Sequence, residues 1–144
     1  MKVYPEINTM KMRTVSRETN DCTVRALMAA AQMSYNEAHA LMAKHGRVFG
    51  KGTHHETQVK AYSEAGGQLR AIFGTTKGAR YRANMVENVP HQKGITLAKL
   101  LEEMPDGRFI CIMRGHAFAI IDRKLADGGP LAGGTRIQAI YRFD

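Results

Sequence analysis

The spacing of apolar residues changes along this chain, and the change restricts the folds that it can adopt. An early segment repeats its apolar residues at i, i+3, i+4 and i+7, which is the pattern of a helix with one buried face. A later region consists of short apolar runs, which is typical of strands. Helices that come first and an antiparallel meander that comes last predict an α+β fold. The periodic residues are Val24, Leu27, Met28 and Ala31, and the strand-like runs are 108–113 and 115–121.

Capping residues mark the expected helix ends. The first helix should start at Asn20 or Asp21, because either side chain can accept from the unpaired N–H groups of a first turn. Ser34 and Glu37 have the spacing of a capping box, which predicts the start of a second helix, and Gly46 suits the position after its end. The expected helices cover residues 21–33, 35–45, 56–65 and 97–104.

The remaining segments predict strands and loops within one domain, 1–144. Residues 1–17 show little periodicity and should form an N-terminal arm with at best one short strand. Residues 74–95 have no clear period and should form a long loop, and 128–134 should form a glycine-rich loop. Strands are expected over 68–73, 108–113, 115–121 and 136–143, with a return through 125–127.

The chain lacks the sequence features of membrane and secreted proteins. No apolar stretch approaches the ~20 residues that span a bilayer, and none near Met1 resembles a signal peptide. We therefore expect no membrane partner and a protein that stays in the cytoplasm where it is made. In that compartment, two cysteines argue against a disulfide framework and leave room for a reactive thiol.

The charge balance is basic, with 21 Lys and Arg against 13 Asp and Glu and a formal net charge of +8. Such a chain should be attracted to polyanions or to an acidic protein. The positive residues are scattered over the arm and the central loop, and the sequence has no dense basic helix or aromatic-interleaved motif. We therefore expect weak, nonspecific attraction to polyanions.

Two segments far apart in the sequence carry residues suited to thiol catalysis. Cys22 lies in the expected first turn of the first helix, where the N–H groups and the helix dipole favour a thiolate. His116 begins a strand, and Gly115 before it should allow close approach of the backbone. Thiol catalysis needs a base that exchanges the proton and a group that fixes the base's tautomer.

Two aspartates are candidates for that third group. Asp122 lies on the same face of the strand as His116, but about 20 Å along it at ~3.3 Å per residue. A hairpin centred near Arg123 places Asp127 opposite residue 119, roughly 10 Å along the strand from His116, and a bulge could shorten the gap. We predict that Asp127 orients the imidazole, with Asp122 as the alternative.

The segment 18–30, with Asn20-Asp-Cys-Thr-Val-Arg-Ala-Leu27, and the segment 96–122 with Asp127 also carry a family likeness. They resemble the cysteine-bearing helix and the histidine-bearing hairpin of small papain-like cysteine peptidases encoded by bacteriophages. The resemblance implies a papain-like fold, in which N-terminal helices carrying the cysteine pack on a C-terminal antiparallel sheet carrying the histidine. It also implies Cys22 as nucleophile, His116 as base, Asp127 as orienting group, and a protein or peptide as substrate, with no cofactor.

Peptidases of this kind often use a glutamine upstream of the cysteine as a second oxyanion donor, and Ser16 stands in that region here. Asn20, together with the N–H of Cys22, is our candidate for the oxyanion donors. The 74–95 and 128–134 loops are expected to flank the cleft.

These residues lead to two hypotheses about function. The first is a cysteine-dependent hydrolase of peptidase or isopeptidase type, encoded by a phage and acting in the host cytoplasm. The alternative is a catalytically silent papain-like fold that serves as a structural component of the virion or binds a host protein.

Other candidate residues have weaker support. His54-His-Glu56 resembles the start of a zinc-protease helix, but Val59 occupies the position of the second histidine. Cys111 lies within an apolar strand and is expected in the core. No cysteine or histidine spacing supports a zinc site, so we expect no metal.

Overall fold

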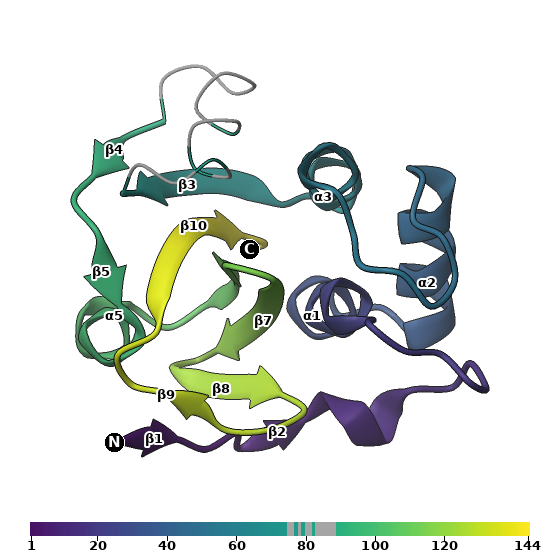
Figure 1. Ribbon diagram of the computed structural model, residues 1–144, viewed down its shortest axis with the longest axis horizontal. Coiled ribbons are helices and arrows are strands. Elements are labelled where there is room, and N and C mark those ends of the chain that lie inside the picture. Colours follow the sequence, from purple (N-terminus) through teal and green to yellow (C-terminus); the bar gives the residue numbers. More distant parts are fainter. Residues whose placement is uncertain (75–76, 78, 80–81, 83–88) are drawn as a thin grey trace.

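A mixed sheet lies at the centre of the molecule and helices pack against both of its faces (Figure 1). The computed structural model describes residues 1–74, 77, 79, 82 and 89–144. Its helices are α1 (Cys22–Ala31), α2 (Tyr35–Lys44), α3 (His55–Glu64) and α5 (Leu97–Glu103), with a short 3₁₀ helix, η1 (Thr9–Met12). Its strands are β1 (Lys2–Val3), β2 (Ile7–Asn8), β3 (Gln68–Phe73), β4 (His91–Gln92), β5 (Ile95–Thr96), β6 (Arg108–Met113), β7 (His116–Ile121), β8 (Lys124–Asp127), β9 (Leu131–Ala132) and β10 (Arg136–Arg142).

The strand order of the main sheet in the described part of the chain is β2-β8-β7-β6-β10-β3-β4. β6, β7 and β8 form an antiparallel meander. β10 comes after all the other strands in sequence but lies between β6 and β3, and it also pairs with β5. β10 therefore joins the β6–β7–β8 meander to β3.

α1 lies against the face of the sheet that carries the alanines of β7 and β8 (Figure 1). Ala117, Ala119 and Ala126 have almost no exposed surface, and their short side chains allow the helix to approach the strands closely. Leu27 and Ala30 of α1 are fully buried in the same cluster. This packing fixes the N-terminal end of α1 beside the start of β7.

The opposite face of the meander packs against α5. Phe118, Ile120 and Leu125 point into this second apolar cluster, where they join Leu97 and Leu100 of α5. The alternation of sides along β7 is thus the one that its sequence predicts, with alanines toward α1 and larger residues toward α5.

The structure confirms a mixed α+β architecture and the expected helices, with small differences at their ends. The capping box at Ser34 and Glu37 is formed in both directions, and Gly46 follows the end of α2 with a φ of 109°. Thr96 accepts from the backbone of Lys99 and so caps α5.

Three expected loop regions contain more structure than predicted. The 1–17 arm holds two short strands and η1 in place of at most one strand. The described residues of the 74–95 loop include β4, which pairs in parallel with β3, and part of β5; residues 75–76, 78, 80–81 and 83–88 lie outside the described residues. The 128–134 loop contains β9, which pairs with β1. Two-residue ladders have no periodicity that a sequence could reveal.

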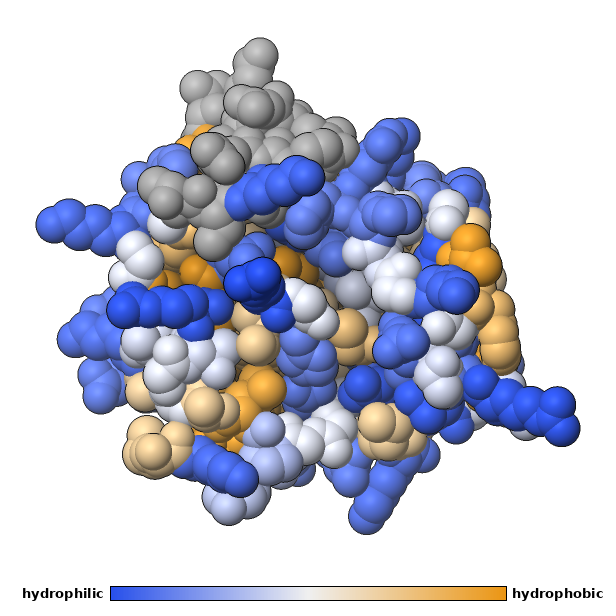
Figure 2. Space-filling view, in the orientation of Figure 1, coloured by the Kyte–Doolittle hydropathy of each residue, from blue (hydrophilic) through white to orange (hydrophobic). Residues whose placement is uncertain are grey.

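Hydrophilic residues cover most of the face in Figure 2, and hydrophobic residues form small separate patches there. None of the helices in the described part of the chain is long and apolar enough to cross a membrane.

Candidate active site

Cys22 is the first residue of α1 and is partly exposed. The predicted side-chain cap of this helix is wrong: Asp21 occupies the N-cap position, but its carboxylate makes no hydrogen bond to the first-turn N–H groups. Other residues bind that carboxylate instead, as described below. The Asp21 side chain therefore leaves the N–H groups of this first turn uncapped.

His116 is the first residue of β7 and pairs across the meander with Met113 of β6. Its ring is stacked on that of Phe118, with 6.2 Å between the ring centroids. Gly115 adopts a φ of 72°, but no atom lies within 4 Å of where its Cβ would be. Glycine is therefore needed at this position for its backbone conformation, and not for the close approach that we expected.

Asp127, and not Asp122, contacts the histidine. The distance between His116 Nε2 and Asp127 Oδ2 is 2.7 Å. The turn consists of Asp122 and Arg123, which both have positive φ, and Ala119 pairs with Ala126. Continuing this register by one step places Asp127 opposite residue 118, one residue nearer to His116 than we predicted.

Asp122 has a structural contact of its own. Its Oδ1 accepts from the backbone N–H of Gly107 at 3.0 Å, which ties the turn to the loop before β6.

The His116 ring lies beside the Cys22 thiol: each group shifts the pKa of the other, and both line the cleft described below. Because Asp127 occupies Nε2, the ring nitrogen that remains for the thiol is Nδ1. Burial acts to raise the pKa of Cys22, but the hydrogen bond and charge of His116, the N–H of Ala117 and the charge of Arg25 outweigh it, and the pKa is lowered. The site therefore favours a thiolate.

The pKa of the His116 imidazole is shifted in the opposite direction, upward. Burial acts to lower the pKa of His116, but its hydrogen bonds to Asp127 and Cys22 and their negative charges raise it to about 9. A raised histidine pKa and a lowered cysteine pKa together favour a thiolate–imidazolium pair near neutral pH.

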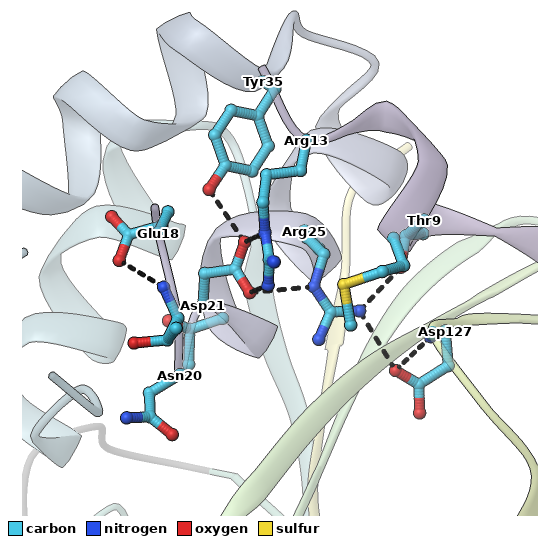
Figure 3. A network of polar contacts seen from close by, with 12 residues as sticks. Thr9, Arg13, Glu18, Asn20, Asp21, Arg25, Tyr35 and Asp127 are labelled. Atoms are coloured by element: carbon cyan, nitrogen blue, oxygen red, sulfur yellow. Dashed lines mark hydrogen bonds and ion pairs between the residues drawn. The ribbon is translucent and has the colours of Figure 1, made fainter. Parts of the chain in front are cut away.

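A buried arginine, Arg25, joins Asp127 to Asp21, the residue before Cys22 (Figure 3). Arg25 Nη1 lies 3.5 Å from Asp127 Oδ1 and donates to Thr9 Oγ1 at 2.9 Å, and its Nε donates to Asp21 Oδ1 at 3.1 Å. Asp127 Oδ1 also accepts from the N–H of Gly128 at 2.8 Å. Both oxygens of the Asp127 carboxylate are thus held in place.

Asp21 is the other centre of this network. Arg13 donates to both of its carboxylate oxygens, and the hydroxyl of Tyr35 donates to Oδ2 at 2.7 Å (Figure 3). Burial acts to raise the pKa of Asp21, but these donors and Arg25 lower it well below its usual range. The Asp21 carboxylate, which the sequence indicated as one of two candidate helix caps, thus binds Arg13, Arg25 and Tyr35 instead. The Asp21–Arg25 spacing of four residues is the signal that could have indicated it.

A second buried carboxylate fixes the loop opposite Cys22. Glu18 accepts from His39 at 2.6 Å, from both terminal nitrogens of Arg47 at 3.0 and 3.1 Å, and from the N–H of Gly50 at 2.8 Å. Burial acts to raise the pKa of Glu18, but these donors lower it to about 2. No pattern in the sequence indicated this cluster, because its members come together only in the folded chain.

A cleft of about 760 Å³ includes Cys22 and His116. Its walls come from η1 and the arm, from the start of α1, from the segment between α2 and α3 with the first turns of α3, and from the β6–β7 connection. The prediction that the 74–95 and 128–134 loops flank it is wrong for the described residues of both, because none of them lines the cleft. Thr23 and Thr53 link two of its walls through a hydroxyl–hydroxyl hydrogen bond of 2.6 Å.

Asn20 also lines the cleft, two residues before Cys22. Its backbone has a φ of 52°, a conformation that asparagine tolerates better than most residues. Its side-chain nitrogen donates to the carbonyl of Gly50 at 3.0 Å, so one of the two amide hydrogens is used within the protein. Its role as an oxyanion donor stays a prediction.

The remaining candidates lie as follows. Cys111 is fully buried in β6, as expected, and burial raises the pKa of its thiol far above the usual range. His54 and His55 stand at the start of α3 and line the cleft. Within the described residues, no group of three or more histidine, cysteine, aspartate or glutamate side chains is arranged to hold a metal ion.

Comparisons of the chain with models of protein families, with curated proteins and with solved structures find no match.

Proposed function

We propose that this protein is a cysteine-dependent hydrolase of peptidase or isopeptidase type, with a papain-like arrangement of Cys22, His116 and Asp127. The observation that carries the proposal is the pairing at one end of the cleft. The thiol lies beside an imidazole that lowers its pKa, and Nε2 of that imidazole is 2.7 Å from the oxygen of a buried carboxylate. A nucleophile, its base and an orienting group in this order match the requirements of thiol catalysis.

In the proposed reaction, the thiolate of Cys22 attacks the carbonyl carbon of an amide bond. The negative charge that develops on the carbonyl oxygen is stabilised by the N–H of Cys22 and by the positive end of α1. The His116 imidazolium gives its proton to the leaving amine, which departs and leaves a thioester on Cys22. His116 then takes a proton from water, whose oxygen attacks the thioester, and the carboxylic acid and the thiolate–imidazolium pair are released.

The resemblance of the cysteine-bearing and histidine-bearing segments to phage peptidases supports the same proposal. On that basis we propose a phage-encoded enzyme that acts on protein in the host cytoplasm. If the site is silent, the protein is instead a papain-like module of the virion or a binder of a host factor, and the following experiment separates these functions.

The experiment compares the two thiols of the native protein. Iodoacetamide at neutral pH should label Cys22 at least about a hundredfold faster than Cys111, as measured by peptide mass spectrometry, and His116→Ala should reduce the Cys22 rate by at least about tenfold. His54→Ala, a second histidine of the same cleft, is the matched control and should retain most of the rate. A Cys22 rate equal to that of an ordinary exposed thiol and independent of His116 would refute the proposal and leave the silent module.

A further inference from the structure

The cleft that contains Cys22 is lined almost entirely by neutral and basic side chains. Among the described residues that line it, Asp21 is the one carboxylate, and it is fully engaged by Arg13, Arg25 and Tyr35. The charges next to the nucleophile therefore cancel within the protein. The net charge that a substrate encounters therefore comes from the part of the cleft lined by Lys51, His54 and His55.

Among the described residues that line this outer part of the cleft, the one charged side chain is a lysine. Lys51 lines the cleft, is exposed, and forms no ion pair with any residue that the structure describes. His54 and His55 follow it on the same wall. Gln58 lines the cleft one turn into α3, and the buried Arg82 donates to its side-chain oxygen from behind.

Positive groups lie near the part of the cleft lined by Lys51, His54 and His55, and they act on the pKa of His55. It is lowered first by burial and then by the positive charges of Arg82, His54 and Lys77. Burial disfavours any charge at this point, and the three positive groups disfavour a further cation in particular. The exposed ammonium group of Lys51 and these nearby positive groups thus favour an anion over a cation along the wall formed by Lys51 and the start of α3.

The occupant that fits this wall is a peptide and not a nucleic acid. Proteins that bind single-stranded nucleic acid usually stack bases on aromatic rings, and no phenylalanine, tyrosine or tryptophan is among the described residues that line the cleft. The bond that a thiolate–imidazolium pair attacks is also a carbonyl bond of the kind that a peptide supplies.

We propose that the Lys51–His55 wall selects substrates with an acidic segment, Asp- or Glu-rich, beside the bond that Cys22 attacks. This inference rests on the proposed hydrolase function and adds the class of its substrate. The acidic side chains lie along the wall while the scissile carbonyl reaches Cys22. Complementary charges of this kind raise the rate of encounter and lose their effect as salt is added.

The test uses two peptide vinyl sulfones that differ only in their flanking residues, Asp and Glu in one and Asn and Gln in the other. Both can form a covalent adduct by addition of the Cys22 sulfur to the vinyl group. At low ionic strength the acidic peptide should label Cys22 about tenfold faster than its amide twin, and most of this difference should disappear in 0.5 M NaCl, a concentration at which the Debye length is only about 4 Å.

Two charge-reversal variants distinguish the effect of the Lys51–His55 wall from the effect of the protein's net charge. Lys51→Glu should remove the preference for the acidic peptide. Lys124→Glu changes the total charge equally but lies at the β7–β8 turn, outside the cleft, and should retain the preference. Equal loss in both variants would attribute the preference to overall charge and overturn the inference.

Iodoacetamide labelling of Cys22 keeps the two proposals distinct. Fast labelling that depends on His116, combined with equal rates for the two peptides, would preserve the hydrolase and overturn the acidic substrate. Protection of Cys22 from iodoacetamide by a single-stranded oligonucleotide, with no effect of the acidic peptide, would overturn it in favour of a nucleic acid. Slow labelling that is independent of His116 would remove the hydrolase itself.

Discussion

The two free cysteines of this protein lie in regions that shift the thiol pKa in opposite directions. Cys111 lies in the middle of β6 with no exposed surface, and burial alone raises the pKa of its thiol. Burial also acts first on Cys22, but at the end of α1 it is outweighed by His116, by the N–H of Ala117 and by Arg25, and the pKa is lowered. Burial acts in the same direction on both thiols, so the opposite shifts of their pKa values follow from the donors and charges around Cys22.

Removing each thiol in turn should break this comparison most strongly. Cys22→Ala should abolish thiol-dependent hydrolysis and cost little stability, because the side chain lies at a partly exposed helix end. Cys111→Ala should retain the activity but lower the free energy of unfolding by about 1 kcal/mol, because it leaves a small cavity in the core. Peptide hydrolysis and urea unfolding measure the two effects, and activity that follows Cys111 would reverse our assignment.

Replacing Asp127 and Asp122 by alanine, one at a time, should show which contacts of His116 affect the reactivity of Cys22. Asp127→Ala removes the partner of His116 Nε2 and should slow any Cys22-dependent reaction by about tenfold or more. Asp122→Ala removes the acceptor for the N–H of Gly107 and should mainly lower stability, by about 1 kcal/mol. The labelling rate and the melting temperature, measured on both variants, distinguish these effects; the opposite ranking would identify Asp122 as the orienting group.

The smallest effect is on the titration of the histidine. The pKa of His116 is raised to about 9, so the ring should keep its proton as the pH rises from 6.5 and lose it near pH 9. In Cys22→Ala the negative partner is missing, and the NMR titration midpoint of His116 should move to lower pH. Cys111→Ala should leave the midpoint unchanged, whereas an equal shift in both variants would show that the two thiols do not differ as we describe.

Local signals in the sequence predicted the elements that carry the site. The capping box before α2, the strand pattern of β7 and the glycine after α2 each depend on neighbours within a few residues. The contact between His116 and Asp127 was also predictable, because a short hairpin joins them. The register was wrong by one residue because Asp122 and Arg123 both adopt positive φ in a two-residue turn, which the sequence does not mark with glycine or asparagine.

The features that could not be predicted depend on contacts between distant segments. Asp21 has the sequence of a helix cap, but Arg13 and Tyr35 approach its carboxylate in the folded protein and replace that role. The walls of the cleft come from the segment after α2 because Glu18 holds Arg47 and the N–H of Gly50. Neither arrangement leaves a periodic pattern in the sequence.

The position of β10 has a consequence for the protein during its synthesis. β3 and the β6–β7–β8 meander lie on either side of this strand, so they cannot join until residues 136–142 have left the ribosome. Cys22 emerges early and behaves as an ordinary thiol until His116 is folded against it. Cys22 therefore has no His116 or Asp127 beside it until the β6–β7–β8 meander has been synthesised, and the joining of β3 to that meander waits further for β10.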